Sequence, residues 1–270
     1  YLSNVDYKVV TKGGNVNFGV PFTEFDRVFF GIGVEDTTVD VYGNDRSPAR
    51  YIEYVEKFGT LNNGVGNAHT TAIPLTVAWQ RDNRDSALVP NNGRLQRFNS
   101  ETGVAGDARY VRANYQIQQY VALNKQYTLA FNGELGWGKG LGGRLYPVFK
   151  NFYSGGLGSV RGFQQGTLGP RDVTGASIGG PKRLTLNTEV ITPFPGAGND
   201  RSLRMYGFFD VGNTFGENQK FTLSELRASV GVGVSWISPV GPLRFAIANA
   251  VRKLPGDKIQ KVQFQIGTAF

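Results

Sequence analysis

Apolar and polar residues alternate along most of this chain, and that alternation restricts the fold more than any other feature. Side chains of a β-strand point alternately to opposite faces, so a period of two predicts strands with one apolar and one polar face. The clearest segments are 110–120, 127–137, 183–192, 226–236 and 261–270. Weaker alternation predicts strands at 14–22, 26–41, 68–81, 94–103, 202–215 and 242–252, and residues 1–10 allow part of one more. We therefore expect a single all-β domain over residues 1–270 with about 11–12 strands.

Composition excludes most catalytic and metal chemistry. The chain has no cysteine and a single histidine, His69, so it cannot form a cysteine–zinc site or a histidine cluster. His69 stands next to threonines where a solvated loop residue is expected, and Asp82 and Asp85 lie in a polar turn. Residues 138–143 match GxGxxG, but no helical pattern follows them, which a nucleotide site would require. We expect no enzymatic activity, no metal and no cofactor.

The formal charge of +8 raises the question of nucleic acid binding. Lysine and arginine are scattered, however, and no basic run or recognition helix is present. A basic surface or lumen explains the charge better, so we expect no nucleic acid partner.

Strand length and connection length favour a transmembrane antiparallel β-barrel over a soluble sandwich or barrel. The strands are about ten residues long, enough to cross the hydrocarbon core at a tilt. Short connections are expected near 22–26, 122–126, 193–201 and 238–242, and long ones near 42–67, 139–182 and 215–225. Membrane barrels place short turns in the periplasm and long loops outside the cell.

The last predicted strand keeps its alternation to the end of the chain. Phe264, Ile266 and Phe270 share one face, and the strand resembles the terminal signal of bacterial outer-membrane barrels. Gly267 has no side chain to pack and would permit a kink, although a small lumen-facing residue is an equally good explanation. These four residues are candidates for a seam strand.

The segment 139–182 is rich in glycine and aromatic residues, and it does not alternate. Connections of this length without secondary structure are usually functional or disordered. This segment contains several short motifs, and three later stretches of the chain carry further ones. The motifs are residues 151–156, Val160, Arg161, Gly162, Phe163, Gly169-Pro170, and then 189–193, 208–212 and 236–242.

In this order, the motifs resemble the BamA family, the barrel assembly factors of the Bam complex. The resemblance is convincing over about residues 108–270 and weaker over 14–107. It implies a protein of the Gram-negative outer membrane, with segment 139–182 as an extracellular loop that folds into the lumen. Its implied partners are unfolded outer-membrane β-barrel clients, Bam accessory lipoproteins, the lipid bilayer and lipopolysaccharide.

The chain departs from that family in length. The family has sixteen strands preceded by periplasmic POTRA domains, through which the lipoproteins mainly bind. This chain shows no POTRA sequence and begins around the fifth or sixth strand of the family pattern, so we expect a barrel lacking its first strands.

The resemblance also implies that Arg161 pairs with acids on the inner wall. Glu189 lies on the polar face of its strand, and Asp210 alternates with Phe209 and Val211. A guanidinium fork suits two carboxylates, and a charge in a partly dry lumen is costly unless paired. The alternative is that Arg161 is a solvated loop residue.

The function that the resemblance implies is assembly and membrane insertion of β-barrel proteins at a seam, where an edge strand templates an incoming strand. Two other functions fit the fold: a polypeptide-exporting pore of the two-partner secretion type, and a passive porin. A soluble binding sandwich is the alternative outside the membrane.

Overall fold

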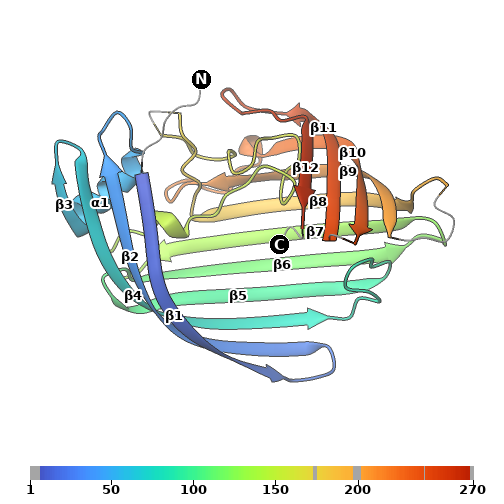
Figure 1. Ribbon diagram of the computed structural model, residues 1–270, viewed down its shortest axis with the longest axis horizontal. Helices are drawn as coiled ribbons and strands as arrows, with labels where there is room; N and C mark the ends of the chain where they lie inside the picture. Colours follow the sequence, from blue (N-terminus) through green and yellow to red (C-terminus); the bar gives the residue numbers. More distant parts are fainter. Residues whose placement is uncertain (1–6, 173–174, 197–201, 240, 268–270) are drawn as a thin grey trace.

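The structure, a computed structural model, describes residues 7–172, 175–196, 202–239 and 241–267. Its strands form one antiparallel sheet in the order β1-β2-β4-β5-β6-β7-β8-β9-β10-β11-β12, with β3 paired to β4 (Figure 1). The strands are β1 (Tyr7–Pro21), β2 (Asp26–Tyr42), β3 (Gly59–Asn62), β4 (Val65–Asp82), β5 (Gly93–Gly106), β6 (Tyr110–Ala122), β7 (Thr128–Gly140), β8 (Lys182–Pro193), β9 (Leu203–Phe215), β10 (Arg227–Ser238), β11 (Gly241–Arg252) and β12 (Val262–Ile266). The helices are α1 (Ala49–Phe58), η1 (Val148–Lys150) and η2 (Leu223–Glu225).

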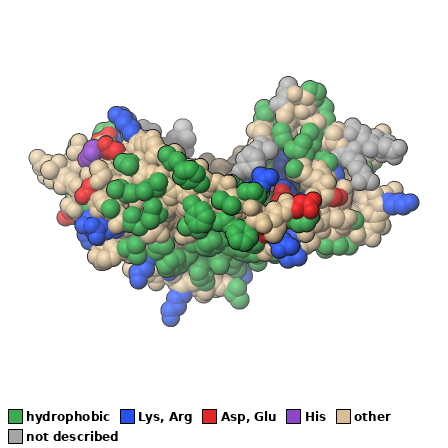
Figure 2. All heavy atoms as spheres, turned by 90° about the horizontal axis from the view of Figure 1, so that it is seen from below, with side chains coloured by type: hydrophobic (Ala, Val, Ile, Leu, Met, Phe, Trp, Pro, Cys, Tyr) green, Lys and Arg blue, Asp and Glu red, His purple; other side chains and the backbone are tan. Residues whose placement is uncertain are grey.

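The predicted antiparallel all-β architecture is confirmed, and its strands alternate as expected. Outward positions carry apolar side chains such as Phe18, Ile32 and Leu135, whereas inward positions mix polar side chains such as Asn187 with apolar ones such as Val39. From below, hydrophobic side chains form a broad patch over the outer face (Figure 2). The sheet curls around a concave side, here called the lumen, but it is open: within the described residues, β1 and β12 are its two unpaired edges.

Three element predictions need correction. Of residues 1–10, where part of one more strand was expected, residues 7–10 extend β1 and residues 1–6 lie outside the described residues. The predicted last strand, 261–270, is shorter in the described residues: it runs from Val262 to Ile266, and Gly267 has a left-handed φ of +94°, while residues 268–270 lie outside the described residues. Helix α1 lies in a segment where only a loop was expected, although Tyr51, Tyr54 and Val55 recur at helical spacing and are buried.

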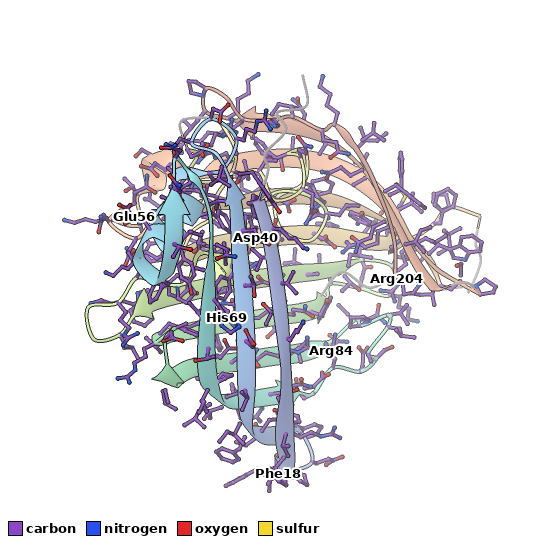
Figure 3. The ribbon with its side chains drawn as sticks, turned by 60° about the vertical axis from the view of Figure 1, so that its left-hand side comes forward. Phe18, Asp40, Glu56, His69, Arg84 and Arg204 are labelled. Atoms are coloured by element: carbon purple, nitrogen blue, oxygen red, sulfur yellow. The ribbon has the colours of Figure 1, made fainter. Side chains whose placement is uncertain are left out.

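Connections at the two ends of the sheet differ in length, broadly as predicted. One end carries the tight turns after β1 and β6, and the other carries α1 and the 141–181 connection. Two connections break the pattern: 83–92 is long at the short-turn end, and 107–109 is short at the long-loop end. Figure 3 shows Arg84 and Arg204 at the short-turn end of the sheet. It also labels His69, which lies on β4, and Asp40, which lies on β2.

The lumen is occupied by the 141–181 connection, here called the long loop, and by α1. Side chains of α1 pack with Val39, Val41 and Val148, which joins the wall at β2, the helix and the long loop in one apolar cluster. The Tyr54 hydroxyl donates a 2.9 Å hydrogen bond to Thr70 on β4. Within the described residues, no helix is long and apolar enough to cross a membrane.

Candidate functional site

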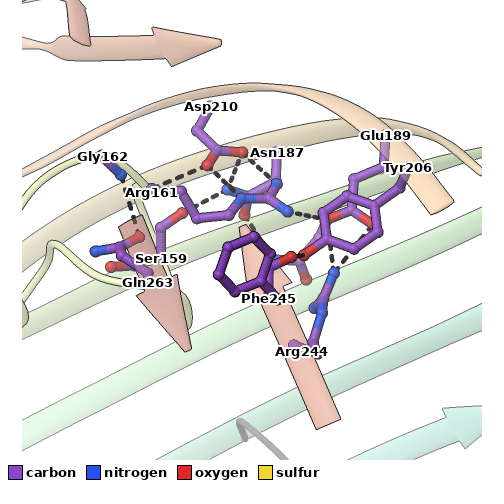
Figure 4. Close-up of polar contacts among 11 residues, drawn as sticks. Ser159, Arg161, Gly162, Asn187, Glu189, Tyr206, Asp210, Arg244, Phe245 and Gln263 are labelled. Carbon is purple, nitrogen blue, oxygen red and sulfur yellow. Dashed lines mark hydrogen bonds and ion pairs between the residues drawn. The ribbon is translucent and has the colours of Figure 1, made fainter. Parts of the chain in front are cut away.

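The side chain of Arg161 is the centre of the contact between the long loop and the lumen wall (Figure 4). Its Nε and Nη2 donate to the two carboxylate oxygens of Asp210 at 2.7 and 2.6 Å, and its Nη1 donates to Glu189 at 2.5 Å. The backbone N–H of Arg161 adds a 3.0 Å bond to Asp210. Antiparallel pairing of β8 with β9 places these two carboxylates beside each other, because Glu189 faces Phe208, two residues before Asp210.

Burial makes this ion pair costly to break, and its geometry is selective for arginine. Arg161 is 2 % exposed and Asp210 is fully buried. A bidentate guanidinium–carboxylate pair combines charge with directional hydrogen bonds, which a lysine could not reproduce. Burial alone would lower the pKa of Arg161, but the carboxylates of Glu189 and Asp210 outweigh that effect, so the pKa is raised and the side chain stays charged.

Neighbouring groups donate further hydrogen bonds to the carboxylates of Asp210 and Glu189. Asn187 Nδ2 donates to Asp210 at 2.9 Å and to the carbonyl of Ser159 at 2.5 Å, and Arg244 donates to Glu189 at 3.0 Å. The Arg161 guanidinium also lies 3.6 Å from the ring centroid of Phe208, a cation–π distance. The site therefore balances two guanidinium groups against two carboxylates.

The residues on either side of Arg161 fit the wall closely. Gly162 has a φ of +86°, and a Cβ atom there would lie 3.0 Å from the Cβ of Ala248 on β11. Val160 and Phe163 are fully buried and pack with Leu168, with Ala250 of β11 against them. The left-handed conformation of Gly162 allows Arg161 to point at β8 and β9 while the residues after it pair with residues 258–260.

A second anchor holds the start of the long loop to the opposite part of the wall. The Lys150 ammonium lies 2.8 Å from Glu35 on β2 and 2.9 Å from Glu101 on β5. Tyr110 donates a short 2.5 Å hydrogen bond to the same Glu101. The long loop thus crosses the lumen between two carboxylate pairs.

The predicted seam residues divide into three groups. Phe264 and Ile266 point outward and are 60 % and 65 % exposed. Gly267 adopts the left-handed conformation and donates a 2.7 Å hydrogen bond to the carbonyl of Pro242. Phe270 lies outside the described residues.

The structure brings Val160, Arg161, Gly162, Phe163, Glu189 and Asp210 together, while their importance for function remains a prediction. Sequence reasoning missed Arg244 and Gln263, which contact Glu189 and the long loop respectively. Both lie at inward positions of alternating strands, so alternation predicts that they face the lumen but does not predict which residues they contact. In the described part of the chain, no group of histidine, cysteine or acidic residues could hold a metal ion.

The Omp85 superfamily domain matches residues 2–270. The chain is 37 % identical over 294 residues to the outer membrane protein assembly factor BamA of Neisseria meningitidis serogroup B, covering 98 % of this chain and 37 % of that protein. It is 29 % identical over 229 residues to the sorting and assembly machinery component 50 homolog of Bos taurus, covering 76 % of this chain and 47 % of that protein.

Among solved structures, BamA from Haemophilus ducreyi lacking POTRA domains 1–3 shares the fold with a TM-score of 0.87 at 24 % identity, covering 96 % of this chain and 54 % of that one. CdiB from Acinetobacter baumannii is more distant, with a TM-score of 0.57 at 13 % identity, covering 96 % of this chain and 41 % of that one. The chain spans about a third of the length of the bacterial relatives it matches, with 37 % of one and 29 % of another covered. The family match over residues 2–270 shows that this chain belongs to the Omp85 superfamily, and within that superfamily it is similar to BamA.

Proposed function

We propose that this chain is the barrel part of an insertase that assembles outer-membrane β-barrel proteins without enzymatic chemistry. The protein belongs to the outer membrane of a Gram-negative bacterium, as the bacterial BamA proteins that it resembles do. Its clients are unfolded β-barrel chains, and the bilayer with its lipopolysaccharide is its working environment. Accessory lipoproteins of the Bam complex would contact the protein mainly through POTRA domains.

The observation that carries the proposal is the edge at β12. This strand pairs with β11 over five positions, from Val262 to Ile266, and within the described residues its other edge has no partner strand. Unpaired N–H and C=O groups of an edge strand can template an incoming strand by β-augmentation. Its outward side chains are apolar, so a client strand that pairs there would add to the lipid-facing surface.

The filled lumen favours insertion over passive conduction. The long loop crosses the lumen from the Lys150 contacts to the Arg161 contacts, and Arg161, Phe163 and Leu168 are buried within it. A porin requires a continuous aqueous channel, and a polypeptide-exporting pore requires that such a loop leave the lumen. A lumen occupied by buried ion pairs fits neither state as it stands.

The direct test is reconstitution. The protein is placed in liposomes, an unfolded outer-membrane barrel is added, and folding is followed by the band shift of unheated samples on gels. We expect faster client folding than in empty liposomes and no steady conductance across a planar bilayer. Client folding at the rate of empty liposomes, together with a stable open conductance, would overturn the proposal in favour of a porin.

A further inference from the structure

The long loop contacts the last strand as well as the lumen wall, and the side chain of Gln263 makes that contact. Gln263 lies on the inward face of β12 and is 4 % exposed. Its Nε2 donates a 2.7 Å hydrogen bond to the carbonyl of Phe163, and its Oε1 accepts a 3.2 Å bond from the N–H of Gly162. One amide side chain therefore pairs with the loop backbone as a neighbouring strand would (Figure 4).

Backbone pairing extends this contact into the segment before β12. Phe163 and Ile259 form an antiparallel bridge. On either side of it, Gln260 N–H donates to the Gly162 carbonyl at 3.0 Å, and Gln164 N–H donates to the Lys258 carbonyl at 2.9 Å. Residues 258–260 are thus paired with the long loop rather than with β11.

This pairing sets where the last strand begins. Strand β11 continues to Arg252, but its pairing with β12 covers only Leu243–Ile247 on the β11 side. One more bond, from the Ala248 N–H to the Lys261 carbonyl at 2.8 Å, ends the contact. Beyond that point the chain follows the loop, so the loop takes the place of a longer β11–β12 ladder.

The residues that hold β12 are the direct neighbours of Arg161, whose side chain holds β8 and β9. Undocking of Arg161 would move Gly162 and Phe163 away from Gln263, and loss of the Gln263 contacts would weaken docking in return. Two contacts that depend on one segment share a coupling free energy, and such coupling is reciprocal.

We propose that Gln263 is a positioning residue that couples docking of the long loop to the pairing of the last strand. Its amide offers a donor and an acceptor on the same group, and both are used: they hold the start of β12 only while Arg161 is docked. The relevance of this coupling to insertion rests on the proposed function, because β12 is the edge assigned there to the client. The coupling itself is a property of the protein without a client.

The test is amide hydrogen exchange of the protein in lipid nanodiscs, without client. Gln263→Ala removes both side-chain bonds, and Gln263→Glu keeps the shape but replaces the donor with a carboxylate. Gln265→Ala is the control, because Gln265 lies two positions along the same strand on the same face and, within the described residues, makes no such bond to the loop. Arg161→Lys weakens docking without touching β12.

We expect both Gln263 variants to accelerate exchange about tenfold or more at residues 262–264 and at 160–164 together, since each lost hydrogen bond shifts the equilibrium several-fold. Arg161→Lys should accelerate exchange in β12 as well, and Gln265→Ala should leave the long loop unchanged. If Gln263→Ala affects β12 alone, or if Arg161→Lys leaves β12 protected, the coupling is refuted. Because no client is present, failure of the insertion assay would not produce either result.

Discussion

Removal of the Arg161 side chain tests the physical basis of loop docking. In Arg161→Ala, Asp210 stays buried with the Asn187 amide as its remaining side-chain donor among the described residues, whereas Glu189 keeps Arg244. Removing one partner of a buried ion pair destabilises a protein by about 3–5 kcal/mol, because the remaining charge is uncompensated. We expect the docking equilibrium to fall by about two to four orders of magnitude, with most of the loss arising at Asp210.

A double-mutant cycle assigns the effect to that pair. Asp210→Asn removes the charge that Arg161 would leave behind, so Arg161→Ala in that background should be milder by about 2 kcal/mol. Docking is measured by protease cleavage of the long loop and by hydrogen exchange at 158–164 in the membrane-embedded protein. Arg144→Ala is the matched control, because this arginine lies in the same loop and donates to the carbonyl of Asp107 at the surface.

Two results would refute the reasoning. One is additivity, in which Arg161→Ala reduces docking of the long loop equally in the unmodified protein and in the Asp210→Asn background. The other is equality between Arg161→Ala and Arg144→Ala, which would mean that burial and pairing contribute nothing beyond a surface contact.

Other parts of the lumen allow three more tests. Lys150→Met should release the start of the long loop at a cost of about 1–2 kcal/mol, because its two carboxylate partners are partly exposed, and protease cleavage near 141–150 reports it. Gly162→Ala should impair docking more than Gly166→Ala, since both glycines have a positive φ but of the two only Gly162 would bring a Cβ within 3.0 Å of a side chain, and thermal unfolding of the two variants measures the difference. Burial raises the pKa of Tyr54 to about 12. The stability that this burial provides is complete below the unfolded pKa of about 10 and is lost as pH rises through the folded value, so α1 should loosen above pH about 10. Other buried tyrosines also have raised pKa values, so the alkaline titration of tyrosinate absorbance is compared between the unmodified protein and Tyr54→Phe, and the difference should be a step near pH 12.

Much of the wall could be predicted from the sequence because strand alternation is a local property. Asp210 lies between the apolar residues Phe209 and Val211, so alternation predicts that it faces inward. Glu189 lies two residues after Asn187, on the same polar face of its strand, and is predicted to face inward as well. The family resemblance implied that Arg161 enters the lumen, and the need of a buried arginine for carboxylates then indicated these two acids, which lie well inside later strand patterns.

Contacts that depend on the curvature of the sheet could not be predicted in this way. Gln263 meets Gly162 across 101 positions of sequence, and Arg244 meets Glu189 across 55. Alternation gives the face of each residue but not which distant residues that face approaches. Helix α1 was missed for a different reason: its short helical period lies inside a segment that otherwise reads as a connection.

Clients are proposed to pair with the edge of β12 that has no partner strand within the described residues, and site-specific photo-crosslinking tests this pairing most directly. A photoreactive phenylalanine replaces Phe264 on β12 or Val232 on β10, two outward apolar positions that are 60 % and 57 % exposed. Val232 is the control because β10 is paired on both sides. During client folding in liposomes, we expect a client crosslink from position 264 and none from position 232. Equal crosslinking from both positions, or from position 232 alone, would contradict the claim.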